Sequence, residues 1–336
     1  MARKKTRARK KALPALNAEH RALLDGVRKG NIRAIARAIS LAESGREEFR
    51  ALAGAIYRLA GRAHVIGLTG VPGSGKSTMV RALARVLRAS GRTVGIVAVD
   101  PSSPFSGGAI LGDRVRMTEI SGDPSVFIRS MATRGSLGGL SAATLDAVDV
   151  LDAAGFDVVL IETVGVGQDE VDIVRAAHTV VVVSAPGLGD EIQAIKAGVL
   201  EIADIHVVSK CDRPDANKTI SDLKGMLSLE TRLGGHKAGS WKVRVMPTSA
   251  EKGQGIEDLL KIIDEHRGHL RKTGEMEARR RHILETRILK IAEDIVRARF
   301  RASRESHVAD VIERVAARRS DPHAAAALLL KALHKD

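Results

Sequence analysis

A glycine-rich segment that ends in Lys-Ser carries the clearest chemical signal in the sequence. The segment comprises Gly70, Val71, Pro72, Gly73, Ser74, Gly75, Lys76, Ser77 and Thr78. Its glycines let the backbone curl so that the N–H groups surround phosphate oxygens. Lys76 would neutralise the β- and γ-phosphates of a nucleotide, and the Ser77 hydroxyl is placed to bind Mg²⁺. Because an apolar run precedes the segment and an amphipathic helix pattern follows it, we predict a Walker A phosphate-binding loop.

An acidic residue closes another apolar run, where a phosphate-binding protein needs a carboxylate for Mg²⁺. This acid, Glu162, is followed by Gly165, which can approach the γ-phosphate closely because glycine has no side chain. Glutamate stands where most GTPases carry aspartate, and the extra methylene still permits a water-mediated metal contact. Gln168 resembles a water-orienting group, with a polar loop residue as the alternative. We therefore predict a γ-phosphate-sensing loop at residues 162–168.

Two further acids lie on either side of a segment rich in proline and glycine. Asp100 ends an apolar run and precedes Pro101 and Pro104, which stop the strand and stiffen its exit. Asp113 follows glycines that suggest a loop able to close over a nucleotide. Both acids are candidates for contacts to Mg²⁺ or its waters. The alternatives, a strand-end turn acid and a surface acid, stay equally open on the residues alone.

Two short motifs further along the chain bear on which base is bound. Ser209, Lys210 and Asp212 stand where guanine-binding proteins carry Asn-Lys-x-Asp. The pair Ser249 and Ala250 resembles the second guanine loop. An aspartate accepts hydrogen bonds from guanine N1 and N2, whereas adenine has no matching donors. The serine hydroxyl is shorter than the usual asparagine amide, so we expect no equivalent bridge and a weaker affinity. The order of motifs predicts GTP and GDP as ligands in preference to ATP.

The elements that must hold these residues alternate between strand and helix patterns. Short Val- and Ile-rich runs predict strands at residues 64–68, 93–99, 157–161, 179–184 and 205–208. These runs show no polar alternation, which is typical of parallel strands buried on both faces. The predicted fold class is α/β: a P-loop NTPase with a mostly parallel sheet sandwiched by helices, and with helical extensions at the N- and C-terminal ends.

Periodicity and composition divide the chain into four predicted segments. In chain order they are a basic tail (1–15), an N-terminal helical arm (16–60), the P-loop domain (61–268) and a C-terminal helical arm (269–336). The last segment contains an apolar stripe with heptad-like spacing at Leu284, Ile288, Ile291 and Ile295. Such a stripe predicts one long amphipathic helix.

Composition limits the classes of protein that remain. The chain has 336 residues with 44% hydrophobic content, enough for one large domain with extensions. Cys211 is the single cysteine, which excludes an internal disulfide framework and favours a reducing compartment. No apolar run in the sequence is long enough to cross a bilayer. We expect a cytoplasmic protein without a membrane partner, with the mitochondrial matrix as a less favoured alternative.

The positive charge is concentrated at the start of the chain. The formal net charge is +14, and residues 1–11 hold seven Lys and Arg without an acid. A solvated tail is the preferred interpretation, and the alternatives are contact with nucleic acid or an acidic partner and a mitochondrial transit peptide. Aromatic residues make up 2% of the chain. Because base stacking needs aromatic side chains, nucleic-acid binding is not favoured.

Longer segments of the sequence resemble one family, the methylmalonyl-CoA mutase-associated GTPases of the MeaB or ArgK type. They are VDPSSPFSGGAILGDRVRM at 99–117, GSLGG at 135–139, ETVGVGQ at 162–168 and GDEIQAIKAG at 189–198. The resemblance extends over residues 32–281, which is most of the chain, and these segments are more specific than the phosphate loop alone.

The resemblance implies a homodimeric GTPase that serves an adenosylcobalamin-dependent acyl-CoA mutase such as methylmalonyl-CoA mutase as a chaperone. In that role it gates cofactor loading and protects the mutase. The helix at 284–295 would be the dimer arm. The nucleotide and Mg²⁺ site would contain Lys76, Asp100, Asp113 and Glu162. A mobile loop that couples nucleotide state to the mutase would contain Asp190, Gln193 and Lys196.

An ATP-dependent kinase or ATPase of the ArgK transport type is the alternative function. Asp212 argues against it because its carboxylate suits guanine. The sequence also contains no recognisable acceptor-activating aspartate motif beyond the metal acids. Depletion of ATP and GTP measured side by side would separate the two functions.

Overall fold

The computed structural model describes residues 16–44, 47–100, 120, 122–132, 140–163, 169–187, 201–232, 239–302 and 308–333. Within these residues the centre of the fold is a seven-stranded parallel sheet with the order β3-β2-β4-β1-β5-β6-β7. Its strands are β1 (His64–Thr69), β2 (Val94–Asp100), β3 (Val126–Ala132), β4 (Val158–Glu162), β5 (Thr179–Ser184), β6 (Ile205–Val208) and β7 (Arg244–Pro247). The predicted α/β fold with a parallel sheet is confirmed.

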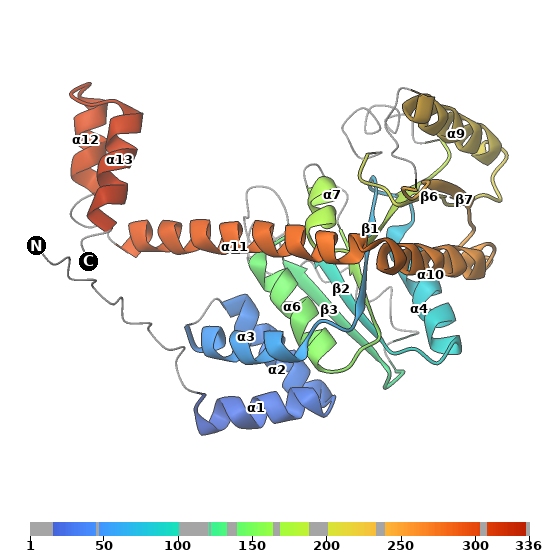
Figure 1. Ribbon diagram of the computed structural model, residues 1–336, viewed down its shortest axis with the longest axis horizontal. Coiled ribbons are helices and arrows are strands. Elements are labelled where there is room, and N and C mark those ends of the chain that lie inside the picture. Colours follow the sequence, from blue (N-terminus) through green and yellow to red (C-terminus); the bar gives the residue numbers. More distant parts are fainter. Residues whose placement is uncertain are drawn as a thin grey trace, which may run out of the picture. The chain divides into compact units, whose positions relative to one another are not determined.

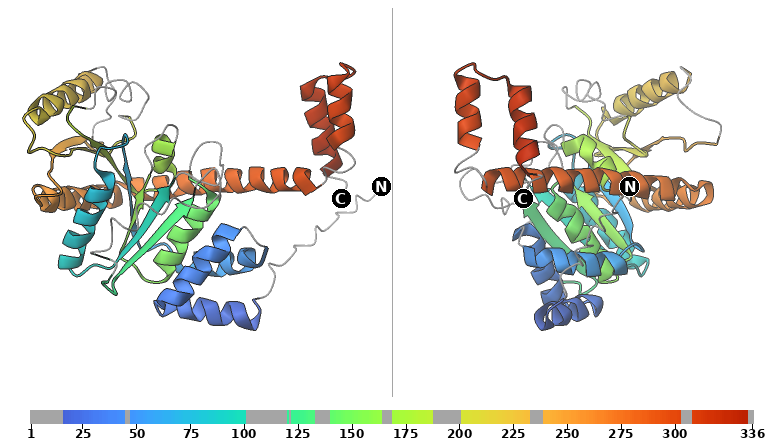
Figure 2. Two further views of the ribbon diagram at one scale, coloured as in Figure 1. Left: turned by 180° about the vertical axis from the view of Figure 1, so that it is seen from behind. Right: turned by 60° about the vertical axis from the view of Figure 1, so that its left-hand side comes forward.

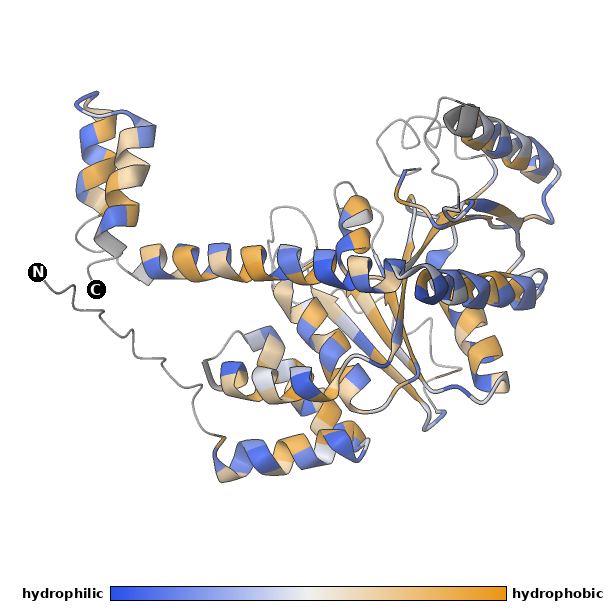
Figure 3. Cartoon of the chain, viewed as in Figure 1, coloured by the Kyte–Doolittle hydropathy of each residue, from blue (hydrophilic) through white to orange (hydrophobic). Residues whose placement is uncertain are grey.

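The central strands are apolar on both faces because helices cover both sides of the sheet. Every residue of β1 is buried. Val65 joins one hydrophobic core, whereas Ile66 and Leu68 join the core on the opposite face, as the alternation of side chains along a strand requires. The central strands accordingly appear largely hydrophobic in Figure 3, whereas the outer strands include hydrophilic residues.

Different helices cover the two faces of the sheet (Figures 1 and 2). One face packs against α4 (Lys76–Ala89) and α10 (Ile256–Thr273), which contribute side chains such as Leu83 and Leu259 to its core. The other face packs against α6 (Ala142–Ala153) and against helices from the start of the chain. The result is three layers, and the carboxyl ends of the parallel strands point to one common edge.

The first three helices share a core with the sheet. They are α1 (Ala18–Arg28), α2 (Ile32–Ser44) and α3 (Glu47–Leu59). Asn17 begins α1 as an N-cap that accepts a hydrogen bond from the backbone N–H of His20 at 2.7 Å. Ile35, Ile39 and Leu52 are fully buried in the same cluster as the side chains of α6. These helices therefore belong to the same compact unit as the sheet.

The carboxylate of Asp152, near the end of α6, positions the start of β1. It accepts hydrogen bonds from the backbone N–H groups of Gly61, Arg62 and Ala63 at 2.7, 3.0 and 3.1 Å. On the other side of this segment, the guanidinium of Arg280 donates to the carbonyl of Gly61 at 3.0 Å. The entry into the strand that carries the phosphate loop is thus held by side chains distant in sequence.

The remaining elements complete the described part of the chain. They are α7 (Asp169–Asp172), the 3₁₀ helix η1 (Ile173–Arg175), α9 (Ala216–Arg232), α11 (Glu275–Ala302), α12 (Ala309–Ala316) and α13 (Pro322–Leu333). The chain divides into two compact units, residues 1–280 and 281–336. Within the second unit α12 packs against α13, and Pro322 occupies the first turn of α13, where proline is favoured. The predicted segment boundaries stay predictions. No helix within the described ranges is long and apolar enough to span a membrane.

Candidate nucleotide-binding site

The phosphate loop lies at the carboxyl edge of the sheet, between β1 and α4. Gly70 has a backbone φ of +139°, and a Cβ atom built there would lie 2.1 Å from the carbonyl oxygen of Val183 on β5. Glycine is therefore required at this position by close backbone approach. Gly75 has a φ of +93° and forms the N-cap of α4. The backbone therefore turns sharply at Gly75, and the N-terminus of α4, which carries partial positive charge, faces the phosphate loop.

Lys76 is held inside the curve of this loop. Its side chain is buried, and its Nζ donates hydrogen bonds to the carbonyl oxygens of Gly70 at 2.6 Å and Val71 at 3.0 Å. An ammonium group in this position is surrounded by the backbone that would contact phosphate oxygens. The predicted neutralisation of the β- and γ-phosphates by Lys76, and its role in catalysis, stay predictions.

A hydroxyl and a carboxylate meet next to the phosphate loop. The Ser77 Oγ donates to Glu162 Oε1 at 2.5 Å, and Glu162 is buried at the end of β4. The pairing of β1 with β4 sets Leu68 beside Glu162, which brings this acid to the mouth of the loop. Thr163, the next residue, donates its hydroxyl to the buried Thr69 hydroxyl at 3.0 Å. This contact ties the start of the sensing loop to β1.

The donor atoms at this point fit a small hard cation. Mg²⁺ prefers oxygen ligands and usually keeps several waters, so one hydroxyl and one carboxylate from the protein are a suitable partial set. Within the described residues, no group of three or more His, Cys, Asp or Glu side chains gathers as a metal cage. The Ser77–Glu162 pair is accordingly the part of the predicted Mg²⁺ site that can be described.

Several predicted site residues cannot be placed with the others. Asp113, Gly165 and Gln168 lie outside the described residues. Asp100 is the last residue of β2, two positions beyond Ala98, which is paired with Glu162. Its backbone therefore ends at the same edge of the sheet, while its side chain lies outside the described part. The coupling-loop residues Asp190, Gln193 and Lys196 are also outside it.

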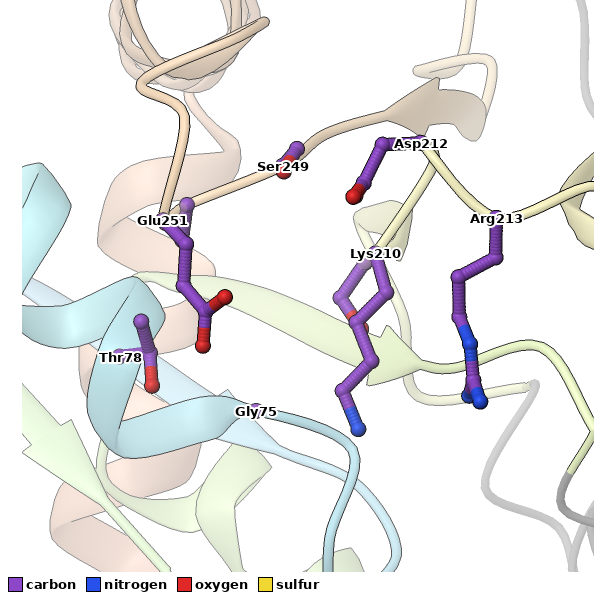
Figure 4. A pocket seen from close by; sticks show the side chains of 9 residues that line it. Gly75, Thr78, Lys210, Asp212, Arg213, Ser249 and Glu251 are labelled. Atoms are coloured by element: carbon purple, nitrogen blue, oxygen red, sulfur yellow. The ribbon is translucent and has the colours of Figure 1, made fainter.

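A pocket of about 240 Å³ adjoins the phosphate loop (Figure 4). Its lining comprises Gly75, Thr78, Ser209, Lys210, Asp212, Arg213, Ser249, Ala250 and Glu251. The structure thus brings residues from the phosphate loop together with both predicted base-binding motifs, although they are far apart in sequence. Sequence reasoning missed Arg213 and Glu251. The indication available in the sequence was that these two residues directly follow Asp212 and Ala250, which belong to the predicted base motifs.

Neighbouring strands hold the two base motifs side by side. β6 leads into residues 209–213, and β7 leads into residues 248–252, and the two strands are paired in parallel. The backbone N–H of Cys211 donates to the carbonyl of Thr248 at 2.9 Å, and Thr248 N–H donates to Val208 at 2.8 Å. Ser249 exchanges two backbone hydrogen bonds with Gln254. The pocket wall is therefore a continuation of the sheet's hydrogen bonding.

Asp212 is oriented by partners on the β7 side of the pocket. Its carboxylate lies 3.0 Å from Lys252 Nζ, and its side chain points toward Ser249 in Figure 4. Hydrogen bonds from Lys252 and from the Ser249 hydroxyl hold the pKa of Asp212 below its ordinary value. The carboxylate is therefore ionised at neutral pH and can act as an acceptor for two N–H donors of a base. Burial and the adjacent Asp212 raise the pKa of the Cys211 thiol.

Ser209 connects the base motif to the phosphate loop. Its Oγ donates to the carbonyl oxygen of Ser74 at 2.6 Å, and both residues are buried. The hydroxyl thus makes one contact to the phosphate loop, and the expectation that it gives no bridge equivalent to that of an asparagine amide stays a prediction. The two loops lie close together: a Cβ atom built at Gly75 would be in ordinary van der Waals contact with Ser209 Oγ, at 3.7 Å. The expected loss of affinity from this serine stays a prediction.

Comparisons with known proteins agree with this geometry. The family described as methylmalonyl-CoA mutase-associated GTPase MeaB matches residues 35–305. A putative GTPase of Pyrococcus horikoshii is 48% identical over 309 residues, covering 92% of this chain and 96% of the relative. A probable GTPase of Mycobacterium tuberculosis is 44% identical over 263 residues, covering 77% and 78%. Among solved structures, a LAO/AO transport system kinase has a TM-score of 0.67 at 25% identity and covers 95% of this chain and 99% of its own.

The family match covers most of the chain, including the phosphate loop, both base motifs and α11. The fold is that of P-loop nucleotide hydrolases, and the curated relatives with high identity are named GTPases. The predicted enzyme class, a hydrolase acting on GTP, is confirmed at this level. The chain belongs to the methylmalonyl-CoA mutase-associated GTPase family.

Proposed function

We propose that this GTPase acts as a chaperone for an adenosylcobalamin-dependent acyl-CoA mutase, gating cofactor loading and protecting the mutase from inactivation. The main supporting observation is that one pocket is lined by Gly75 of the phosphate loop and by the ionised Asp212. The family of this chain is described by its association with methylmalonyl-CoA mutase. A GTP-dependent switch is the chemistry that such an arrangement supports, because nucleotide state can be transmitted through loops that contact the γ-phosphate.

In this proposal each part of the site has a separate task. Asp212 accepts the N1–H and N2–H groups of guanine, and the backbone N–H near Ala250 meets the base oxygen. Lys210 lies along the base with its aliphatic stem. The phosphate loop binds the β- and γ-phosphates, and Lys76 neutralises their charge. The discrimination against adenine follows from the donors that adenine lacks.

The hydrolytic residues form a separate part of the proposal. Ser77, Asp100, Asp113 and Glu162 would hold Mg²⁺, which, when bound, supplies positive charge to the phosphate oxygens. Gln168 would orient the attacking water. Residues 163–168 contain no arginine, so we expect slow hydrolysis by the protein alone and faster hydrolysis with its partner.

The homodimer is also part of this proposal. In the second unit the apolar side chains of Ile288, Leu289 and Ile291 on α11 are 64%, 59% and 38% exposed. Large exposed apolar side chains on one helix are typical of a surface that binds another protein. A replacement of Ile288 by glutamate should shift the protein toward a monomer in light scattering, and an unchanged mass would contradict the proposed dimer arm.

Co-purification with candidate mutases is the direct test of the chaperone function. Methylmalonyl-CoA and isobutyryl-type mutases would be captured in the presence of GDP, GTP and a non-hydrolysable GTP analogue. We expect a complex whose stability depends on the nucleotide, and loss of that dependence in Lys76→Ala but not in Lys224→Ala, a control at an exposed lysine on α9. Binding to no mutase, together with phosphoryl transfer to a small molecule, would overturn the proposal.

A kinase function is the second candidate, and the observation in its favour is the structural likeness to a protein described as a LAO/AO transport system kinase. Such an enzyme would consume ATP in the presence of a small acceptor. Depletion of ATP and GTP in parallel reactions distinguishes the candidates. GTP consumption without an acceptor supports the GTPase chaperone, whereas acceptor-dependent ATP consumption supports the kinase.

A further inference from the structure

We propose that three arginines beside the amino end of β1 form a binding site for the phosphate group of a small soluble ligand. They are Arg267 and Arg271 on α10 and Arg280 on α11, and they are named here the arginine cluster. The cluster lies next to the segment that enters β1, whereas the nucleotide pocket adjoins the phosphate loop at the other end of the strands. The inference therefore does not depend on which nucleotide the pocket binds.

The first support is that the cluster gathers side chains from two helices at one place. Arg267 Nη2 donates to the carbonyl oxygen of Arg62 at 3.4 Å, and Arg280 Nη2 donates to the carbonyl oxygen of Gly61 at 3.0 Å. These two carbonyls belong to consecutive residues, so the two guanidiniums lie near one another. Arg271 follows Arg267 by four residues and is therefore its neighbour on the same face of α10.

The second support is that the cluster has more positive charge than nearby acids balance. Among the residues that the structure describes, no ion pair joins either cluster arginine of α10 to an acid. Asp264, an acid on the same helix, is bound through both oxygens by Arg92 at 2.8 and 3.0 Å. The ion pair of Arg280 is a 3.4 Å contact with Glu277, which is 73% exposed, so solvent screens it. A bound oxyanion would supply the missing negative charge.

The third support is that the surroundings of Arg267 oppose its charge. Burial, followed by the charge of Arg271, lowers the pKa of Arg267 below its ordinary value. The buried Nε–H of Arg267 has no hydrogen-bond partner within the described ranges, although a guanidinium is rich in N–H donors. Like charges that are placed together against their own repulsion favour a ligand-binding role over a purely structural one. An anion among the guanidiniums would offset that repulsion.

The form of the cluster favours phosphate over other anions. A guanidinium presents paired N–H donors in one plane, which match two oxygens of a phosphate group. A phosphate has enough oxygens to accept from several arginines at once, whereas a carboxylate has only two oxygens. Double-stranded nucleic acid is bound by a longer stripe of cations that follows its backbone. The compact cluster therefore fits one phosphate group of a small molecule best.

Phosphorus NMR with inorganic phosphate as the probe is the direct test. The full-length protein is saturated with Mg²⁺ and a non-hydrolysable GTP analogue, which fills the phosphate positions of the nucleotide pocket. The change in the phosphate resonance during a titration gives the dissociation constant. We expect roughly tenfold weaker binding in Arg267→Gln and in Arg271→Gln than in the wild type, because each variant loses charge-assisted hydrogen bonds. Lys261→Gln, at an exposed lysine on α10, is the matched control and should bind as the wild type does.

Comparison probes and variants make every outcome informative. Fluorescence of Trp241, the single tryptophan, gives the unfolding midpoint of each variant, and the exposed Arg271 carries the test if Arg267→Gln does not fold. Equal phosphate affinity in the wild type and in folded cluster variants overturns the inference. A resonance that changes only without the GTP analogue places phosphate in the nucleotide pocket and also overturns it. Tighter binding of succinate or duplex DNA than of phosphate, at equal ionic strength, overturns the assignment of the ligand.

Discussion

The two ends of the parallel strands differ in how far their polar side chains are enclosed. At the carboxyl ends, side chains bond to the phosphate loop and to one another, as Ser209 does to Ser74 and Ser77 to Glu162, and they leave a pocket open. At the amino ends, side chains bond to one another and to backbone groups inside the protein, and His64, Thr179 and His266 are each almost fully buried. The same sheet therefore carries an edge with an open pocket and a closed edge.

The closed edge is a chain of side-chain contacts from β1 to α10. His64 Nε2 lies 2.8 Å from Thr179 Oγ1, which lies 2.9 Å from His266 Nδ1, and His266 Nε2 lies 3.4 Å from Asp204 Oδ1. Arg279, in the first turns of α11, binds both oxygens of Asp204 at 2.7 and 2.5 Å. This network joins the strands to α10 and to the start of α11.

The difference indicates that the carboxyl edge of the sheet serves nucleotide binding, whereas the buried groups of the amino edge serve stability. A loop that binds ligands must leave its backbone N–H groups available, so its own contacts use carbonyls and its pocket stays open. At the closed edge the backbone N–H groups need not stay available for a ligand. Buried polar groups there are stabilised by partners within the protein. We therefore expect changes at the carboxyl edge to alter nucleotide chemistry and changes at the amino edge to alter the free energy of unfolding.

The largest expected effect is on catalysis at the carboxyl edge. Lys76→Ala removes the ammonium group from the phosphate loop, and GTP turnover measured by phosphate release should fall by about 10²–10³-fold. The unfolding midpoint should change little because the bonds lost are to carbonyls of the loop itself. Lys224→Ala serves as the control. If GTP turnover in Lys76→Ala is undiminished, the expected difference between the carboxyl edge and the amino edge does not hold.

The next effect is on stability at the amino edge. Asp204→Ala removes the carboxylate partner of the Arg279 guanidinium and the acceptor of the Val180 backbone N–H, and the free energy of unfolding should fall by about 3 kcal/mol. Urea unfolding followed by Trp241 fluorescence measures this change. Asp258→Ala, at an exposed acid on α10, should cost at most about 1 kcal/mol. A loss of GDP affinity equal to the loss of stability in Asp204→Ala would contradict the comparison.

We also expect a group at the amino edge to make the free energy of unfolding sensitive to acid. Burial, followed by the charges of Arg280 and Arg267, lowers the pKa of His178 to about 3, while the unfolded chain takes up the proton near 6.5. The stabilising contribution of neutral His178 is complete above pH 6.5 and declines by about 1.4 kcal/mol per pH unit below it. The urea midpoint of the wild type should therefore fall more steeply with acid than that of His178→Asn.

The acid experiment has an internal control. The amide oxygen of asparagine can accept the hydrogen bond that Val65 N–H donates to His178 Nδ1 at 3.1 Å, so the variant removes the titrating group with little loss of contact. His323→Asn, at an exposed histidine of α13, should follow the wild type. If the urea midpoint falls equally steeply with acid in the wild type and in His178→Asn, His178 does not contribute to the acid sensitivity.

The smallest expected effect is at the rim of the pocket. Lys252→Met removes the partner of Asp212, but both side chains are partly exposed, 64% and 31%, so solvent screens the interaction. GDP affinity should fall by about threefold or less, and the difference should shrink as salt is raised. A larger loss that persists in high salt would mean that Lys252 contacts the nucleotide directly.

The strands of the sheet were predicted where both faces are buried. β1, β4, β5 and β6 fall within two residues of their predicted positions. β3 was missed because it is the edge strand, where partial burial permits Arg129 and Ser130 among its apolar residues. The apolar pattern that identifies a buried strand is weaker at such an edge.

Side-chain partnerships were predicted less well than side-chain positions. The contact of the Trp241 ring with His266 on α10, at a centroid distance of 4.8 Å, was not among the sequence predictions. The hydrogen bond from Ser209 Oγ to the carbonyl of Ser74 was likewise not predicted. Neither result could follow from periodicity, because each depends on how closely two distant segments approach.

By itself the sequence determined the glycine-rich loop between an apolar strand and a helix, and the α/β fold, since each of these is encoded by neighbouring residues whose backbone and side-chain chemistry acts locally. The tertiary structure decided which distant residues share a contact: Ser209 with Ser74 at one edge of the sheet, and Asp204 with Arg279 at the other. The physical reason is that strand order and register set the distance between segments far apart in the chain, and hydrogen bonds form only where that distance is short.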